Sequence, residues 1–445
     1  MIDGKTASEI FDSIRQHVTS GILPAGETLP SVRELALQLN VNRNTVAAAY
    51  KRLVTSGLAQ SQGRNGTMIK GSSAPGALEG GNPHTPLTDL SGGNPDPTRL
   101  PHLNRYFAQL KPDHRLYGDA PVSPGLKHWA TQWMQSTLPD TGEITITSGA
   151  IDAIERLLNA HLLPGDSVAV EDPCFLSSIN MLRYAGFSAS PVGVDNEGML
   201  PEILEHALSK GARAVIITPR AHNPTGCSLS AARAAALQEI LAHYPQVLVI
   251  VDDHFALLSS SAWQPVIAVE TRRWAVVRSM SKALGPDLRL AIVASDTATS
   301  ARLRLRLNSG SQWVSHLLQD LVHACLSDEE YQHRLAQNRL FYASQQQKLA
   351  SALQQYGHTV PPGDGLNMWL PLENHSQALA FMLAKSGWLV REGEAFGVSM
   401  PAHGLRITLS TLSDNDINKL ATDIHQALEE VKGKRFIRSH APMRE

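Results

Sequence analysis

The sequence predicts a multidomain protein in which a small helical module with a hairpin precedes a larger α/β domain that ends in a small α+β subdomain. A chain of 445 residues exceeds the usual size of a single domain. Residues 71–90 shift to Gly, Ser, Pro and Ala, a composition typical of a linker. Beyond them, apolar runs such as 168–170, 214–217 and 247–251 alternate with helical stretches, which indicates a largely parallel sheet.

These patterns set the expected boundaries. We expect the helical module at 1–70, a semi-flexible linker at 71–90, the α/β domain at 91–430 with its small subdomain from about residue 340, and a disordered tail at 431–445. An apolar content of 42% permits a large buried core, whereas no apolar run approaches the length of a transmembrane helix.

The cysteines and the N-terminus bear on the cellular compartment. Cys174, Cys227 and Cys325 are far apart and form no CxxC pair, so neither a disulfide framework nor a metal site is expected. The N-terminus is polar from Asp3 onward, which argues against a signal peptide. We expect a cytoplasmic protein without a membrane partner.

The first seventy residues predict three helices and a hairpin. Ile10, Ile14 and Val18 recur at helical spacing. Ser31 and Glu34 form a capping box that starts a second helix. A third helix starts at an N-cap residue and buries a stripe of four side chains; these residues are Asn42 and then Val46, Ala49, Tyr50 and Leu53.

The charge of this module indicates a phosphate-contacting surface. Two short strands, 58–62 and 67–70, surround a turn that contains Arg64. Residues 35–70 hold five basic side chains and no acidic one, although the whole chain has a net charge of only −2. Such a local excess is the electrostatic footprint expected of a nucleic-acid-binding surface.

The start of the third helix holds the candidate DNA contacts. A helix-turn-helix places this end of its second helix in the major groove, where Arg43 can pair with guanine or phosphate and Asn44 with adenine. The run alone is also compatible with the polar face of a small helical domain. The longer pattern of 29–36, 41–46 and 58–67 resembles the winged-helix domain of GntR-type regulators. That resemblance implies binding of double-stranded DNA through Arg33, Asn42, Arg43, Asn44, Thr45 and Arg64.

Lys282 is the candidate for covalent chemistry in the α/β domain. A lone lysine is most often a solvated surface charge, but Ser279 and Ser281 precede this one and Arg289 follows it. A lysine amine forms a Schiff base with an aldehyde, and pyridoxal 5'-phosphate (PLP) is the aldehyde that enzymes hold in this way. The two serine hydroxyls would be placed to donate to its phosphate.

Two further segments match the same chemistry. Ser148, Gly149 and Ala150 lie between a β-rich run and a helix, and backbone amides at a helix N-terminus form a phosphate site. Asp252 follows the apolar strand that ends at Val251, so in a parallel sheet it faces the ligand crevice, whereas Asp253 points to the opposite side. A carboxylate there would keep the pyridine nitrogen of PLP protonated.

Together, these segments resemble fold-type I PLP enzymes of the aspartate aminotransferase kind. The resemblance implies that Ser148, Gly149, Ala150 and Arg289 hold the phosphate, that Asp252 meets the pyridine nitrogen, and that Lys282 carries the cofactor. In the run Asn223-Pro224-Thr225-Gly226, Asn223 would bind the 3'-oxygen. Phe175 would stack on the ring, although a core phenylalanine is equally compatible with its position.

The same resemblance implies a substrate contact and a dimer. Arg406, in Leu405-Arg406-Ile407-Thr408, matches the arginine that grips a substrate α-carboxylate. Tyr117, before Gly118, matches a tyrosine that reaches the phosphate of the neighbouring subunit, which implies a homodimer. One position departs from the family, because His254 and Phe255 stand where active members carry a tyrosine near the 3'-oxygen. His254 would reach the cofactor only if the backbone register allows it.

A winged helix, a linker and an aminotransferase-like body together resemble the MocR family of bacterial regulators, over about residues 5–430. Within it, the helix at 42–49 and the run at 252–255 are most similar to a member linked to vitamin B6 salvage. The leading hypothesis is a transcriptional regulator that binds paired DNA half-sites and responds to PLP, a related B6 vitamer or an amino acid. The alternatives are an active aminotransferase tethered to DNA and a scaffold that has lost PLP binding.

Overall fold

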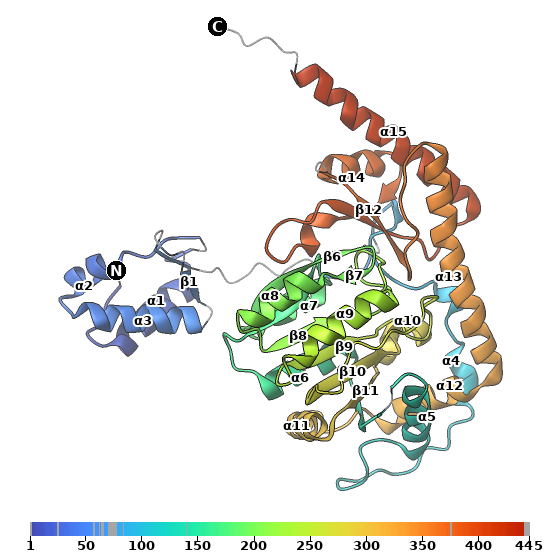
Figure 1. The fold of residues 1–445 in the computed structure, drawn as a ribbon, viewed down its shortest axis with the longest axis horizontal. Coiled ribbons are helices and arrows are strands. Elements are labelled where there is room, and N and C mark those ends of the chain that lie inside the picture. Colours follow the sequence, from blue (N-terminus) through green and yellow to red (C-terminus); the bar gives the residue numbers. More distant parts are fainter. Residues whose placement is uncertain are drawn as a thin grey trace. The chain divides into compact units, whose positions relative to one another are not determined.

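The computed structural model describes residues 2–24, 26–56, 58–61, 63, 66–69, 78–82, 84–138, 140–373 and 376–439. The chain divides into two compact units, one made chiefly of residues 1–78 and one that begins at Glu79 (Figure 1). No helix within these described stretches combines the length and the apolar composition that a membrane crossing requires.

The first unit is the predicted arrangement of three helices and a hairpin. Its elements are α1 (Ala7–Thr19), α2 (Val32–Leu39), α3 (Arg43–Thr55), β1 (Ala59–Ser61) and β2 (Thr67–Ile69). Thr6 and Ser31 each close a capping box, so both α1 and α2 start at a side chain that satisfies their free backbone amides. Ile10, Ile14, Val46 and Leu53 are fully buried and join the helices in one core. The antiparallel hairpin of β1 and β2 confirms the winged-helix class.

The second unit is built on an eight-stranded sheet. In spatial order its strands are β4 (Glu143–Thr147), β11 (Ala291–Ser295), β10 (Arg273–Ser279), β9 (Leu248–Asp252), β8 (Ala214–Ile217), β5 (Ser167–Asp172), β6 (Ser188–Asp195) and β7 (Gly198–Met199). Strands β5, β8, β9 and β10 are parallel to their neighbours in this series, which confirms the largely parallel sheet. Strand β11 runs antiparallel to both neighbours, an exception that the apolar pattern did not reveal.

Helices follow the strands and cover the faces of the sheet (Figure 1). They are α4 (Leu103–Phe107), α5 (Pro124–Gln135), α6 (Ala150–His161), α7 (Leu176–Tyr184), α8 (Pro201–Ser209), α9 (Ala231–Ala242), α10 (Ser281–Leu284), α11 (Thr297–Asn308) and α12 (His316–Ser327). Because both faces are covered, the central strands β8 and β9 are buried at every residue, which explains their continuous apolar runs.

The strand register brings distant segments to one edge of this sheet. Thr147 at the end of β4 pairs with Ala291, which pairs in turn with Ser279 at the end of β10. Asp252 at the end of β9 pairs with Val277, two residues before Ser279. Neighbouring strands lie about 4.8 Å apart, so these strand ends fall within about 10–15 Å of one another. Polar residues that follow them are therefore gathered at one edge of the sheet, the region called the crevice below.

The small subdomain has its own sheet and core. Its antiparallel sheet has the order β12 (Asn367–Pro371), β15 (Gly404–Thr408) and β14 (Arg391–Glu392), beside α14 (Ser376–Lys385) and α15 (Asp414–Ser439). The long helix α13 (Glu329–Gln355) contributes Tyr331 and Leu335 to the core of the large sheet but Leu349 and Leu353 to that of the small subdomain. The transition expected near residue 340 thus lies inside one continuous helix.

Two stretches differ from the expected linker and tail. Thr88 and Asp89 form β3, which pairs with β13 (Trp388–Leu389) through a hydrogen bond from the Thr88 amide to the Gly387 carbonyl at 2.9 Å. The later part of 71–90 is therefore packed on the second unit, whereas 71–77 lie outside the described residues. Helix α15 continues to Ser439 within the tail expected to be disordered, because no proline interrupts the chain before Pro442.

Candidate cofactor site and DNA interface

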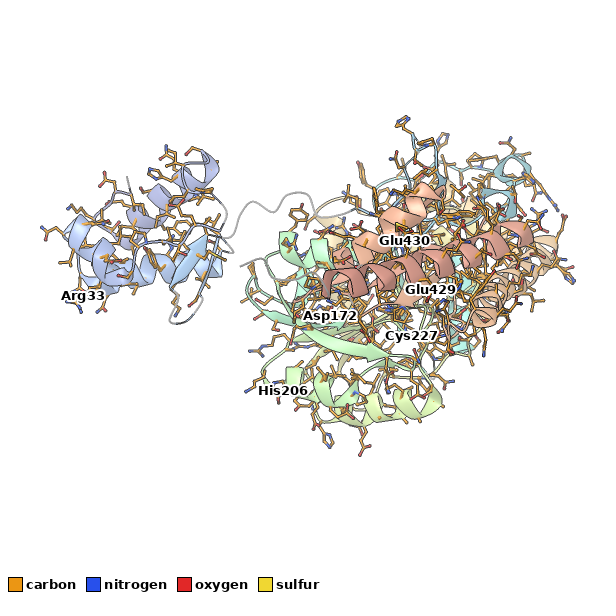
Figure 2. The ribbon with its side chains drawn as sticks, turned by 90° about the horizontal axis from the view of Figure 1, so that it is seen from above. Arg33, Asp172, His206, Cys227, Glu429 and Glu430 are labelled. Atoms are coloured by element: carbon orange, nitrogen blue, oxygen red, sulfur yellow. The ribbon has the colours of Figure 1, made fainter. Side chains whose placement is uncertain are left out.

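The predicted DNA contacts of the first unit gather at the start of α3. The Asn42 side chain accepts a hydrogen bond from the Asn44 amide at 2.8 Å and so fixes where the helix begins. Arg43 and Asn44 are exposed in the first turn, and Thr45 is half-buried beside them. Arg33 is exposed on α2 (Figure 2). Arg64, predicted at the tip of the hairpin, lies outside the described residues.

One basic residue of this unit has a structural contact instead. Arg52 donates to the Ser8 hydroxyl at 2.8 Å, and its guanidinium lies 4.9 Å from the centre of the Phe11 ring. This side chain therefore joins α3 to α1. The simple count of basic residues over 35–70 overstates the charge available to a phosphate backbone.

The second unit has a tight turn where β4 meets α6, at the residues predicted to hold a phosphate. Gly149 has φ +101°, and a Cβ placed there would lie 2.6 Å from Nη2 of Arg289, so the turn requires glycine. Arg289 in turn donates to the Ser148 carbonyl at 3.4 Å. The structure thus places the predicted arginine beside the amides at the start of α6. Helix N-terminal amides and an adjacent guanidinium are the groups that bind phosphate.

Lys282 lies in α10, directly after the end of β10. Its Nζ donates to the Gly93 carbonyl at 2.6 Å, and nearby the Ser281 amide donates to the Ser279 hydroxyl at 3.2 Å. Burial lowers the pKa of Lys282 to about 8; the Glu79 carboxylate opposes this shift and the Arg406 guanidinium adds to it. A larger fraction of the amine is therefore neutral near physiological pH, the form that attacks an aldehyde.

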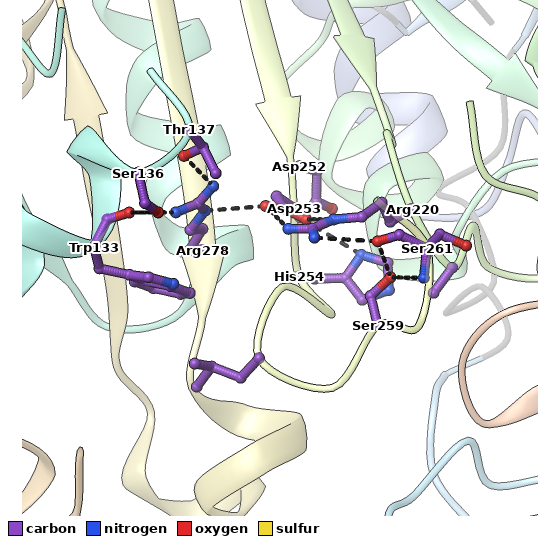
Figure 3. A network of polar contacts seen from close by, with 12 residues as sticks. Trp133, Ser136, Thr137, Arg220, Asp252, Asp253, His254, Ser259, Ser261 and Arg278 are labelled. Atoms are coloured by element: carbon purple, nitrogen blue, oxygen red, sulfur yellow. Dashed lines mark hydrogen bonds and ion pairs between the residues drawn. The ribbon is translucent and has the colours of Figure 1, made fainter. Parts of the chain in front are cut away.

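Asp252 and Asp253 are adjacent but have different partners. Asp252 is buried at the end of β9, and its Oδ1 has no hydrogen-bond partner among the described residues. Burial raises the pKa of Asp252, which the neighbouring His254 opposes and Asp253 reinforces. Asp253 is fully buried and binds Arg220 at 2.6 Å and Arg278 at 3.0 Å (Figure 3). Unlike Asp253, the Asp252 carboxylate has no guanidinium partner within the described part of the chain. A protonated ring nitrogen would supply a cationic one.

Arg406 and Asn223 meet in the same crevice. Arg406 is completely buried on β15, and its Nη1 donates to Asn223 Oδ1 at 2.9 Å. Both Nη atoms also bind the carboxylate of Glu79, at 2.7 and 2.9 Å, and Nη2 donates to the Ser91 carbonyl at 2.6 Å. Sequence reasoning did not identify Glu79, although it is the only acidic residue between Lys70 and Asp89.

A buried pair beside Asp252 was also not predicted. Glu171 Oε2 lies 3.4 Å from Nε2 of His222, and Oε1 accepts from the Thr218 amide at 3.0 Å. Burial raises the pKa of Glu171 to about 8 and lowers that of His222 to about 3. Both side chains are therefore mainly neutral at pH 7, so this wall of the crevice adds no net charge beside Asp252.

His254 and Phe255 stand where active aminotransferases carry a tyrosine. Phe255 is buried, and its ring meets that of Tyr342 edge to face at 6.4 Å. His254 is partly exposed, with Nδ1 3.7 Å from Oδ1 of Asp252. No phenol stands at either position, and only the imidazole lies beside the candidate pyridine-binding carboxylate.

The two predicted aromatic residues, Phe175 and Tyr117, differ in their exposure to solvent. Phe175 is half-buried immediately before α7, beside Cys174, whose amide donates to the Phe396 carbonyl at 2.8 Å. Tyr117 is 84% exposed, and its ring centre lies 5.7 Å from that of Trp313. Within the described part of one chain, the ring contact of Tyr117 is with Trp313 and not with another predicted cofactor residue.

These residues fit PLP by the chemistry of their donors. The cradle of Ser148, Gly149, Ala150 and Arg289, with the hydroxyls of Ser279 and Ser281, would hold the phosphate. The orphaned Oδ1 of Asp252 would meet the ring nitrogen, and the Lys282 amine would meet the aldehyde. When bound, the group supplies that aldehyde and an electron-withdrawing ring.

Comparison with known proteins agrees with this geometry. Residues 85–424 match the model of the family "Aminotransferase class I and II", and residues 6–69 match "Bacterial regulatory proteins, gntR family". The chain thus belongs to the MocR family of bacterial transcriptional regulators, in which a GntR-type winged helix is joined to an aminotransferase-like domain.

Particular relatives narrow this class. The chain is 78% identical over 428 residues to the vitamin B6 salvage pathway transcriptional repressor PtsJ of Salmonella typhimurium, covering 96% of this chain and 100% of the relative. It is 25% identical over 401 residues to the pyridoxine biosynthesis transcriptional regulator PdxR of Corynebacterium glutamicum, covering 85% and 86%. An archaeal alanine:glyoxylate aminotransferase of known structure shares the fold, with a TM-score of 0.70 and 21% identity over 78% of this chain and 92% of that one.

Proposed function

We propose that this protein is a PLP-responsive transcriptional repressor of vitamin B6 salvage genes, acting in the cytoplasm as a homodimer. The 78% identity to the Salmonella repressor, over the whole length of that relative, supports the target genes and the sign of regulation. The winged-helix unit would bind the operator, and the aminotransferase-like unit would bind the effector.

One observation carries the proposal: a cofactor crevice is retained while the groups needed for turnover are altered. Support comes from Lys282, Asp252 and Asn223, which keep the residue types that such a crevice would need, and from Arg289, which lies against Gly149. The tyrosine position holds His254 and Phe255, and the substrate arginine already binds a carboxylate of the chain itself. Such a site favours holding a ligand over transforming substrates.

Each residue of the crevice has a binding role in this proposal. Lys282 would capture the aldehyde through its neutral amine, and Asp252 would keep the ring nitrogen protonated. Asn223 would bind the 3'-oxygen and Phe175 would cover the ring face. Tyr117 would reach the phosphate of a second subunit, and a dimer with two winged helices would recognise two half-sites.

The alternative is an aminotransferase that the first unit tethers to DNA. The buried Arg406 favours some recognition of an α-carboxylate. The absence of a phenol at positions 254 and 255 disfavours efficient turnover, because neither side chain there supplies the hydroxyl that active members carry.

Footprinting of the DNA upstream of the neighbouring genes, with and without PLP, tests the proposal. We expect two protected half-sites whose protection changes with PLP, together with slow or no conversion of amino acids by the purified protein. A footprint that is the same with and without PLP, combined with rapid amino-acid turnover, would favour the tethered enzyme. A protein that develops no visible absorbance band with PLP would favour a scaffold without cofactor.

A further inference from the structure

The carboxylate of Glu79 occupies the place that a bound amino acid would need. Its two oxygens accept from Nη1 and Nη2 of Arg406 at 2.7 and 2.9 Å, a bidentate geometry that matches an arginine fork to a carboxylate. Arg406 is completely buried, so this ion pair lies inside the crevice. Only Nε of Arg406 lacks a partner within the part of the chain that the structure describes.

Each of the two Nη atoms has a second partner as well. Nη1 also donates to Asn223, and Nη2 also donates to the Ser91 carbonyl. A free α-carboxylate that bound Arg406 through two hydrogen bonds would need both Nη atoms, or Nε together with Nη2, and Glu79 and Ser91 already hold Nη2. A ligand carboxylate and Glu79 therefore exclude one another.

The Glu79–Arg406 ion pair is connected to the cofactor lysine. Gly93, with φ +63°, accepts from Lys282 Nζ at 2.6 Å, and a Cβ placed on it would lie 3.3 Å from Arg406 Nη2 and 3.4 Å from Glu79 Oε2. The backbone of Gly93 thus lies against both ionic groups. The charges of Glu79 and Arg406 act on Lys282 in opposite directions.

We propose that Glu79 is a specificity-determining residue, an internal carboxylate that closes the Arg406 subsite so that a free amino acid binds only by displacing it. The inference rests on the proposed function, since it makes PLP rather than an amino acid the preferred ligand of the crevice. Glu79 lies in the segment through which the chain enters the second unit after the winged helix.

Displacement of Glu79 would alter where the connecting chain is anchored. Glu79 is the first residue of the second unit, and the next anchor is the Gly80 carbonyl, which accepts from Arg391 Nη2 at 2.9 Å. Further on, Asn82 is held by its amide, which donates to Asp89 Oδ2 at 2.5 Å. Loss of the ion pair would thus remove the first of these contacts, while those of Gly80 and Asn82 remain.

Titration of the PLP-loaded protein with L-alanine tests the proposal directly. Alanine carries the α-carboxylate and the amine with a minimal side chain, and its binding is followed by isothermal calorimetry. We expect Glu79→Gln and Glu79→Ala to bind L-alanine about tenfold or more tightly than the wild type, because an internal competitor at high effective concentration is removed. Glu205→Gln removes an exposed carboxylate from α8 and should bind like the wild type. Equal affinity in the wild type and both Glu79 variants would overturn the proposal.

Hydrogen exchange of the wild-type protein tests the proposal even if both Glu79 variants fold poorly. Hydrogen exchange of the amides from Leu78 to Gly81 is compared without and with saturating L-alanine. Faster exchange with alanine supports displacement of Glu79, whereas alanine binding with unchanged exchange there would contradict it. The proposed function has a separate readout, because a PLP effect on operator affinity requires no alanine. A failure of one is therefore distinguishable from a failure of the other.

Discussion

In the winged-helix unit the described candidate contacts lie on two neighbouring helices and are exposed or half-buried, whereas in the aminotransferase-like unit they come from distant segments and range from the fully buried Arg406 to the exposed Arg289. Arg43 and Asn44 follow one another in a single helical turn. Lys282 follows β10, Asp252 ends β9 and Arg406 lies within β15, so these three residues come from three different strands of two sheets. The first arrangement needs only local structure, and the second needs the whole fold.

This difference follows from what each unit would bind. DNA is a large, charged surface, so side chains that meet it remain solvated until it arrives. A small cofactor must be enclosed, so its partners are desolvated beforehand and their pKa values move, as those of Lys282 and Asp252 do. Substitutions should accordingly act on different quantities in the two units.

The largest expected effect is at Lys282. Lys282→Ala should abolish the covalent link to PLP, because no other amine is placed at the crevice edge beside Gly93 in the described structure. Borohydride reduction followed by mass spectrometry measures the link. Lys210→Ala, which changes an exposed lysine at the end of α8, should keep it. A reducible adduct that persists in Lys282→Ala would exclude this lysine.

A second comparison contrasts the adjacent carboxylates. Asp253→Asn should lower the free energy of unfolding by about 3–5 kcal/mol, because it leaves the buried guanidiniums of Arg220 and Arg278 without their anion. Urea denaturation followed by tryptophan fluorescence measures this change. Asp252→Asn is the matched control and should weaken PLP binding while it preserves stability. If Asp252→Asn were the more unfolded of the two, the assignment of the two roles would be wrong.

The next effect concerns the exposed unit. Arg43→Ala should weaken operator binding by about 1–3 kcal/mol if the arginine contacts a base, without a change in the unfolding curve. Fluorescence anisotropy at one fixed salt concentration measures the affinity. Arg15→Ala, which removes a surface arginine paired with Asp12 on α1, serves as the control. An unchanged affinity for Arg43→Ala would remove this residue from the interface.

The smallest effect is a shift with pH. Burial places the pKa of Lys282 at about 8, so the rate of PLP capture should rise with pH and level off above that value as the amine loses its proton. Since the Glu79 carboxylate raises this pKa, Glu79→Gln should move the midpoint to lower pH, and Glu205→Gln should leave it in place. The growth of the visible absorbance band after mixing gives the rate. A midpoint that moves upward in Glu79→Gln would contradict the electrostatic account.

The sequence was sufficient for features that depend on local spacing. Capping residues such as Ser31 and Asn42, and the apolar runs of the central strands, predicted both units and their fold classes. It could not predict the antiparallel β11 or the continuation of α13 through the subdomain boundary, because pairing and packing decide them.

The same limit applies to the candidate site. Motif residues such as Asn223 and Arg406 were predicted separately. Their direct hydrogen bond, and the pairing of Arg406 with Glu79, depend on tertiary contacts between segments far apart in the chain. The neutral Glu171–His222 pair was missed for a similar reason, since only burial reveals its pKa shifts.

A PLP-responsive repressor requires that the crevice and the exposed helices be energetically coupled. The most direct measurement is operator affinity by fluorescence anisotropy, at fixed salt, for the apo protein, the PLP-loaded protein and Lys282→Ala with PLP. A coupling of about 1–3 kcal/mol predicts that PLP changes the affinity of the wild type by roughly 5–150-fold, that Lys282→Ala loses this response, and that operator DNA changes PLP affinity by the same factor. Identical operator affinity in all three forms would contradict the account.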